Sequence, residues 1–571
     1  MSSRRVIGGA ISILIVAALL ALFFSFRRYM PYLHAPRFSV SVRHLPYYAF
    51  CSFYRMLAAY VLALVFSVAY GMAASRGRMW ERVLIPVIDI AQSVPVIGFF
   101  PAAVYFFVAL TNGSRLGVEM AAIFLIFTSQ AWNLALGVFE SMRTMPADSH
   151  DALEAFGANS WLRFRRLSLP ACVPKLVYNS ILSWVAGWYF LIACEIITVG
   201  PSNYRLPGLG SYLMEAADHG RGTQIVAGLA TLLIIIVLMD VVVWQPLTLW
   251  AEKFRYEFAS GASSEPMRSL GMLHALGGIG PAVYHIARFV LRPLTATVRA
   301  LLDAVPSPAP AVRERIGRAT RNFWIGTLGV LVVLAIYTII KGMIALAAVL
   351  HGPWPAEARL IPAATGASIL RIVIAYAISL GWTLPCALAA ADSARFRRWL
   401  SPIAEIVGSM PATALFPLIV LFVVEVTGGM NLASVLLILT GMQWYLLFNL
   451  LAGVNQIPED LKEATRAYRL SKFATWRKLT VPALLPSMIT GSITAWGGGW
   501  NALILSEYFP YRGKIYKVLG LGALLDAATY QSGNSLMILL SLLSMVVVVV
   551  GLNRLVWRRL YDVATERYKI D

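Results

Sequence analysis

The sequence is poor in charged residues and in cysteine. Of its 571 residues only 13% are Asp, Glu, Lys or Arg while 59% are hydrophobic, which excludes a soluble protein of this length. The four cysteines form no Cys-x-x-Cys pair, so nothing indicates a disulfide scaffold or a zinc site. The only Gly-Lys pair, Gly513-Lys514, is followed by Ile515, so no phosphate-binding loop is present. We expect the chain to hold no metal, nucleotide or other cofactor of its own.

Positive charge exceeds negative charge. Lys and Arg total 48 against 28 Asp and Glu, a formal net charge of +20. The basic residues stand mostly between apolar runs, as the positive-inside bias of a polytopic membrane protein requires. A nucleic-acid partner would instead need a basic face on a soluble module, and we exclude it.

Runs of about 20 mostly apolar residues, the length needed to cross the hydrocarbon core, predict about twelve membrane-spanning helices. The first run is followed by Arg27 and Arg28 without a small-residue cleavage site, so we interpret it as a retained span and not a secretory signal. The predicted spans lie near residues 6–26, 50–74, 84–110, 117–140, 177–199 and 223–249, and near 323–350, 367–390, 403–425, 431–453, 487–508 and 533–556.

A polar segment at residues 250–322 separates the two groups of spans. It holds ten Lys or Arg against five Asp or Glu and includes a Pro-rich run at 306–310, as is typical of a cytoplasmic linker. Between residues 283 and 298 apolar residues recur at helical spacing with arginines among them. This pattern fits either a helix that lies on anionic membrane lipid or a packed linker helix.

The chain repeats itself at a nearly constant spacing, which indicates two copies of one module. The segment Ser180–Trp188 recurs as Ser492–Trp500, 312 positions later. Nearer the start of each half, Arg55 and Arg371 are 316 positions apart, so the halves differ by four residues in length before the fourth span. Further pairs at a spacing of 312 are Trp132 and Trp444, Pro146 and Pro458, Pro170 and Pro482, Glu195 and Glu507, Gly208 and Gly520, and Gly210 and Gly522.

Six predicted spans separate corresponding points of the copies, so both copies enter the membrane in the same orientation. We therefore predict an all-α integral membrane protein of two parallel six-helix repeats, with residues 1–249 as the first half, 250–322 as the linker and 323–571 as the second half. Most basic loops, the linker and both termini then fall on the cytoplasmic side. One basic segment conflicts with this topology because it falls on the outer side: Arg27, Arg28, Arg37 and Arg43.

A polar stretch between the fourth and fifth spans of each half carries the most specific motif. An acid opens a short helix, a sharp turn follows, and a basic stretch leads to an aliphatic-x-aliphatic-Pro ending. Such an element can insert into a groove on a partner. Its residues are Asp151, Ala152, Gly157, Leu169 and Pro170 in the first copy, and Glu463, Ala464, Arg469, Val481 and Pro482 in the second.

With these residues the chain resembles the ABC importer permeases, over roughly residues 50–250 and 367–560. The resemblance implies a type I importer fold, two separate ATPase subunits that bind ATP with magnesium and dock on both loops, and a solute-binding protein outside the membrane. Arg469 departs from the family pattern, which has Gly at this position. Because a left-handed turn costs a non-Gly residue roughly 1–2 kcal/mol, we expect the second loop to differ in shape from the first.

Two further segments are similar to one type of these permeases, the nitrate, sulfonate, taurine and bicarbonate type. They are Ser93-Val94-Pro95 with Phe100-Pro101, and Ser409-Met410-Pro411 with Phe416-Pro417. The similarity implies a multi-pass protein of the bacterial inner membrane that passes a small anion inward.

Polar residues inside the predicted spans are candidates for the translocation pathway. Gln130, Asn133 and Gln443 are uncharged polar residues in apolar runs, which usually face a partner helix or a cavity. Glu195 and Glu507 lie near the outer ends of equivalent spans, where they either order a gate or lie solvated at the interface.

Tryptophans recur beside glycines in the same two spans. Trp188 follows Gly187, and Trp500 follows Gly499 one repeat later. Because a missing side chain lets another helix approach closely, these pairs fit tight packing as well as a lining of the pathway.

Two alternatives remain open on the sequence alone. An ion-coupled secondary transporter can also have twelve spans in two parallel halves, but it needs intramembrane ionisable groups, and few are available besides Glu195, Glu425 and Glu507. A fused ABC permease for ferric ion or thiamine would share both the spans and the coupling loops.

Overall fold

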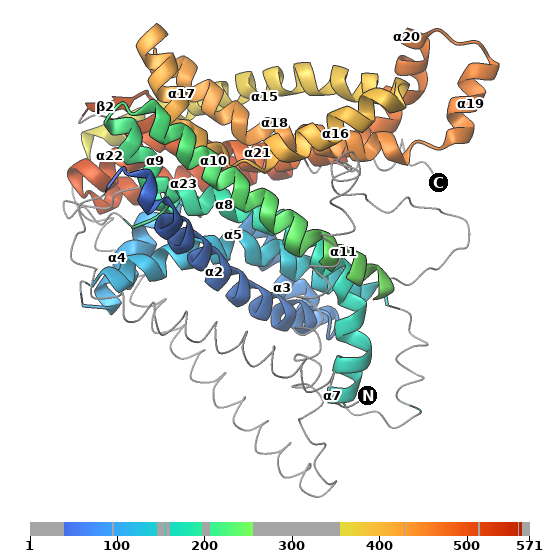
Figure 1. Ribbon diagram of the computed structural model, residues 1–571, viewed down its shortest axis with the longest axis horizontal. Coiled ribbons are helices and arrows are strands. Elements are labelled where there is room, and N and C mark those ends of the chain that lie inside the picture. The colour runs from blue at the N-terminus through green and yellow to red at the C-terminus, as the bar shows by residue number, and fades with distance from the viewer. Residues whose placement is uncertain are drawn as a thin grey trace, which may run out of the picture. The chain divides into compact units, whose positions relative to one another are not determined.

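The computed structural model describes residues 39–93, 96–112, 114–145, 155, 160–196, 206–254, 354–427, 429–511, 514–557, 559–561 and 563 (Figure 1). The predicted spans 6–26 and 323–350 lie outside the described residues, as do Arg27, Arg28, Arg37 and all of the linker beyond residue 254. Asp151, Ala152 and Gly157 of the first loop lie outside them as well.

The first half is helical throughout its described part. A one-turn 3-10 helix, η2 (Val42–His44), leads into α2, which has a proline in its first turn, where a missing N–H costs nothing. Its elements are α2 (Leu45–Ala74), α3 (Arg78–Ser93), η3 (Val96–Phe99), α4 (Phe100–Leu110), α5 (Arg115–Arg143), α7 (Ser160–Arg163), η4 (Phe164–Ser168), α8 (Leu169–Ile196), α9 (Leu209–Asp218), α10 (Gly222–Met239), η5 (Asp240–Trp244), α11 (Gln245–Ala251) and η6 (Glu252–Phe254).

The described part of the second half follows the same order of helices and includes a hairpin, whose repeat positions in the first half lie mostly outside the described residues. Strands β1 and β2 follow α21 directly and pair antiparallel. No sequence pattern predicted this hairpin. The elements are η7 (Ala356–Leu360), α15 (Ile361–Asp392), α16 (Ala394–Ser409), α17 (Ala412–Thr427), α18 (Met430–Gln456), α19 (Glu459–Ala467), α20 (Lys472–Thr475), η8 (Trp476–Thr480), α21 (Val481–Glu507), β1 (Tyr508–Tyr511), β2 (Lys514–Lys517), α22 (Leu521–Ala527), η9 (Ala528–Ser532), α23 (Ser535–Leu552) and η10 (Asn553–Trp557).

Within the described residues, eight of the predicted spans appear as helices long and apolar enough to cross a membrane. The third span of each half was predicted wrongly as one helix. In the second half α16 stops at Ser409 and α17 starts at Ala412, because Pro411 forces Met410 into an extended conformation. In the first half α3 and α4 are likewise separate helices, joined through η3.

The fifth span of each half begins earlier than the apolar run suggests. Helix α7 continues through the π turn η4 into α8, and α20 continues through η8 into α21. In each π turn a backbone N–H bonds five residues back, Leu169 to Phe164 and Val481 to Trp476. The next residue is a proline without an N–H, so the wider turn lets the helix pass it unbroken.

The two halves contact each other through equivalent elements. Helix α17 packs on α8, while η3 packs on α21. The Thr413 hydroxyl donates to the Tyr189 carbonyl at 3.0 Å, and the Val96 N–H donates to Asn501 Oδ1 at 3.0 Å. Tyr189 and Asn501 are 312 positions apart, so the contact has the reciprocal pattern of a two-fold interface.

The short elements lie at opposite ends of the long helices. Helices α7, α19 and α20 lie at one end, whereas α9, α22 and β2 lie at the other (Figure 1). The described parts of the predicted coupling loops are at the first of these ends, where α7 and α20 precede the fifth spans. The second end holds a buried polar cluster in each half.

Candidate functional site

The polar cluster of the first half centres on a buried arginine of α2. Arg55 is 1% exposed, and its guanidinium group donates hydrogen bonds to two carboxylates. Its Nε and Nη2 donate to Glu119 of α5 at 2.6 and 2.7 Å, and its Nη1 donates to Glu195 of α8 at 2.6 Å. One guanidinium therefore ties three helices together.

Glu195 also anchors the short helix α9. Ser52 donates to Glu195 Oε1 at 2.7 Å and accepts from the Leu209 N–H at 2.9 Å. The Gly210 N–H donates to Glu195 Oε2 at 2.8 Å. The N–H groups of Leu209 and Gly210 have no hydrogen-bond acceptor within α9, because they stand at its start. They donate instead to a side chain of α2 and to one of α8.

The second half builds the same cluster from matched residues. Arg371 Nη1 donates to Glu507 Oε1 at 2.7 Å, and Ser368 donates to the same oxygen at 2.7 Å. Ser368 accepts from Leu521 N–H at 2.9 Å, and Gly522 N–H donates to Glu507 Oε2 at 2.8 Å. Each of these partners stands at the repeat position of its counterpart in the first cluster.

Close packing around each carboxylate explains a pair of repeated glycines. A Cβ at Gly208 would lie 2.2 Å from the Glu195 carboxylate, and one at Gly520 would lie 2.1 Å from that of Glu507. Because both carboxylates are held by three donors, neither can move aside without losing hydrogen bonds. Glycine is required here for space, since the backbone at both positions is extended.

The clusters differ in where the second acid lies. Asn431 occupies the place of Glu119 and accepts from Arg371 Nη2 at 3.0 Å. Instead, α22 carries the buried Asp526, at the repeat position of Met214. Burial and the neighbouring Glu507 carboxylate raise the pKa of Asp526 well above its usual range.

The structure separates the predicted pathway residues into two groups. Glu195, Glu507, Trp188, Trp500 and Gln130 are buried within the halves, so a solvated position of the two glutamates is wrong. The Gly187 backbone lies so near Gln130 that an added Cβ would be 2.4 Å from its Nε2, which is the tight packing expected beside Trp188.

The other two polar candidates are only partly buried. Asn133 of α5 donates to the Asn179 carbonyl at 3.3 Å and to the Ser183 hydroxyl at 3.1 Å, both on α8. Gln443 lies half-buried on α18. Asn133 thus joins two helices of one half, and a pathway role for either residue stays a prediction.

Sequence reasoning did not connect Arg55 and Arg371 with the repeated glutamates. The sequence did contain the information. An arginine that occurs at the same position of an apolar span in both halves needs an acidic partner, and that partner should also occur in both halves. Glu195 and Glu507 are repeated acids in the fifth spans, and Ser52 and Ser368 stand three residues before the arginines.

The predicted coupling loop of the second half forms a projecting helix. Helix α19 begins after Pro458 and ends in a left-handed turn at Arg469, with φ of 50°. The Leu470 N–H bonds back to the Thr465 carbonyl, and Ser471 then caps α20 by accepting from the Ala474 N–H. Arg469 thus adopts the left-handed conformation that glycine adopts readily. Because Gly157 lies outside the described residues, the expected difference in shape between the two loops stays a prediction.

Large apolar side chains project from this loop into solvent. Tyr468 is 80% exposed and Phe473 is 72% exposed. The sequence has Phe156 and Trp161 at the repeat positions in the first half. Exposed aromatics of this kind mark a surface that a partner covers.

No group of three His, Cys, Asp or Glu side chains gathers as metal ligands within the ranges that the structure describes. The described arrangement consists of two buried ion clusters at one end of the long helices and the exposed aromatic side chains of the second loop at the other.

Comparison with known families fits this geometry. A sequence model for binding-protein-dependent transport system inner membrane components matches residues 63–245 and again residues 380–561. The two matches together cover more than half of the chain, one in each repeat.

Three similar proteins illustrate the relationship. The nitrate import permease protein of Leptolyngbya laminosa is 24% identical over 175 residues, 31% of this chain and 58% of that protein. The glycine betaine transport system permease protein of Bacillus subtilis is 24% identical over 184 residues, 32% and 60% of the two chains. The bicarbonate transport system permease protein of Synechococcus elongatus is 28% identical over 172 residues, 30% and 57%. The chain spans less than two thirds of the length of these relatives.

Proposed function

The chain belongs to the family of binding-protein-dependent transport system inner membrane components, and on this premise we propose that it is the complete translocation unit of an ATP-driven importer. Each half supplies what a separate permease subunit would supply. ATP and magnesium bind to two separate ATPase subunits, and a solute-binding protein delivers the substrate from outside. Both termini of the chain lie in the cytoplasm of a bacterial cell.

The observation that carries this proposal is the match of the family to both halves, each with its own fifth span and its own buried cluster. The reciprocal contacts of Thr413 with Tyr189 and of Val96 with Asn501 fit a dimer made within one chain. A pathway at a pseudo-two-fold axis follows from this arrangement.

The exposed polar face of α21 is the candidate lining of that pathway. Thr490, Thr494 and Gly497 are exposed along one side of a span, and the two threonine hydroxyls favour a water-filled space over lipid. Asn501 continues this face to the contact with the first half.

A small anion is the proposed substrate. The similar proteins named for nitrate and for bicarbonate support this choice, and the one named for glycine betaine makes a zwitterion the competing outcome. The ion-coupled carrier is not favoured, because Glu195 and Glu507 are fully engaged by arginine, serine and backbone donors.

The test is reconstitution in proteoliposomes with a candidate ABC ATPase and a candidate solute-binding protein from the same organism. Uptake of labelled nitrate or bicarbonate should require ATP on the ATPase side, and the purified chain alone should hydrolyse none. Uptake driven by a proton or sodium gradient without ATPase would overturn the proposal.

A paired substitution tests the docking surface. Tyr468→Ser should weaken co-purification of the ATPase, whereas Tyr178→Ser, an exposed tyrosine within α8, should not. Equal retention of the ATPase by both variants would show that α19 is not its docking site.

A further inference from the structure

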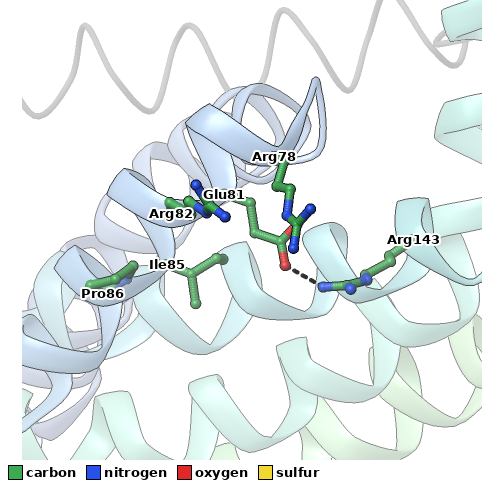
Figure 2. A pocket seen from close by; sticks show the side chains of 6 residues that line it. All are labelled: Arg78, Glu81, Arg82, Ile85, Pro86 and Arg143. Atoms are coloured by element: carbon green, nitrogen blue, oxygen red, sulfur yellow. Dashed lines mark hydrogen bonds and ion pairs between the residues drawn. The ribbon is translucent and has the colours of Figure 1, made fainter.

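A basic cavity lies where the start of α3 meets the end of α5 (Figure 2). Its volume is about 640 Å³, and the lining residues are Arg78, Glu81, Arg82, Ile85, Pro86 and Arg143. None of them belongs to the clusters or to the docking surface described above.

Positive charge is in excess inside this cavity. Three arginines face one carboxylate, and Glu81 pairs with Arg143 (Figure 2). Among the described residues, Arg78 and Arg82 pair with no acid and are exposed. Two guanidinium groups are therefore available to donate bidentate hydrogen bonds to phosphate oxygens.

An apolar face of α3 adjoins the cavity. Met79 is 78% exposed, Trp80 51% and Val83 56%, and with Val87 they recur along one side of the helix. In a membrane protein such a face beside arginines is typical of the level where acyl chains meet head groups.

The cavity lies at the end of α5 from which the first coupling loop departs. Arg143 is the last residue of α5, and the predicted loop motif begins eight positions later at Asp151. The assignment of this end to the cytoplasmic leaflet rests on the proposed function, but the charge and shape of the cavity do not.

We propose that this cavity binds the phosphate-bearing head group of an anionic phospholipid, with Arg78 and Arg82 holding the phosphate and the apolar face of α3 holding an acyl chain. The charge complementarity and the adjoining apolar face favour a lipid over a soluble phosphate. A lipid bound there lies against Arg143 at the C-terminal end of α5.

The second half supplies a matched control because it lacks this combination. The repeat positions of Arg78, Glu81, Arg82 and Arg143 are Ala394, Arg397, Arg398 and Asn455. The acid that orders Arg143 is replaced by another cation there, so the positive charge is similar but the ion pair is absent. Arg82 and Arg398 are both exposed.

The test measures lipid binding to the purified full chain by native mass spectrometry, with phosphatidylglycerol and phosphatidylcholine as probes. Phosphatidylglycerol should bind more tightly to the unchanged protein. Arg82→Ala should weaken its binding roughly fivefold, while Arg398→Ala should leave it unchanged. Glu81→Gln should strengthen binding, because it frees Arg143 for the phosphate.

Three results would overturn the proposal. Equal losses in the Arg82 and Arg398 variants would mean that surface charge alone attracts the lipid. Displacement of phosphatidylglycerol by millimolar glycerol phosphate would assign the cavity to a soluble phosphate. Loss of ATPase association in the Arg82 variant with lipid binding unchanged would assign it to a protein partner. None of the lipid measurements requires transport, so failure of the importer proposal would leave this one testable.

Discussion

The two halves hold the same arginine in two different ways. In the first half two acidic side chains surround the single base Arg55. In the second half one carboxylate and one amide surround Arg371, and the second acid, Asp526, lies on α22. The donors to Glu195 and Glu507, by contrast, are matched one for one.

This difference separates the part of the cluster that the helix geometry fixes from the part that can vary. The Ser–Arg–Glu–backbone arrangement must be kept, because it closes the start of α9 or α22 onto two spans. The place of the second acid is free to vary. Two copies in one chain can diverge in this way, whereas a homodimer of one module would carry the same change on both sides.

The largest effect is expected from removal of the arginines. Arg55→Met leaves Glu119 and Glu195 buried without a cation and should cost about 3–5 kcal/mol, whereas Arg371→Met strands only Glu507 and should cost less. The melting temperature of the purified chain is the measurement, with the exposed Arg359→Met as control. Equal losses in both halves would show that the second carboxylate has no electrostatic role.

Substitution of the repeated glycines should affect the halves equally. Gly208→Ala and Gly520→Ala each place a Cβ within about 2.2 Å of a fixed carboxylate, so each should cost roughly 1–3 kcal/mol. Gly222→Ala, where a Cβ meets nothing within 4 Å, serves as the control in the same thermal assay. Unequal costs at Gly208 and Gly520 would break the equivalence of the two clusters.

A double-mutant cycle can test whether Asp526 is the relocated acid. Asn431→Glu alone gives the second cluster a third acid and should destabilise it, whereas Asn431→Glu with Asp526→Met reproduces the residues of the first cluster. The coupling free energy should favour the double variant, by roughly 0.5–3 kcal/mol. Additive effects in thermal unfolding would mean that the two positions are independent.

Asp526 should also make stability depend on pH. Its pKa is raised in the folded chain, so the protonated form favours folding, and this contribution is lost as pH rises above the ordinary aspartate value of about 3.9. Asp526→Asn should therefore be more stable than the unchanged chain at neutral pH, with an advantage that shrinks as pH falls toward 4. An advantage that is constant with pH would assign the effect to packing.

The smallest effect is expected from Arg469→Gly in the second coupling loop. Arg469→Gly removes a left-handed arginine and should stabilise the turn by about 1 kcal/mol or less, with nearly unchanged uptake. Gly157→Arg should be the more damaging change for uptake and ATP turnover in the assembled complex. A larger loss from Arg469→Gly would show that this arginine has its own contact on the ATPase.

Much of the architecture could be predicted from the sequence. Apolar runs gave eight of the spans, and the 312-residue spacing gave the two halves. The breaks before α4 and α17 were missed because the apolar run continues across Pro95 and Pro411, and hydropathy does not register a backbone turn. The hairpin β1–β2 was missed because strand pairing depends on a register that segments of only four residues do not reveal.

Membrane insertion, the duplication and the positions of the predicted coupling loops along the chain all follow from local composition and spacing, so they can be inferred from the sequence alone. The pairing of Arg55 with Glu195 and of Arg371 with Glu507 depends on the folded packing, since each pair joins residues more than 130 positions apart. The same packing decided that Gln130 and Trp188 are buried within a half and that Arg78 and Arg82 share a cavity. Burial and pairing are properties of several helices together, and no single segment encodes them.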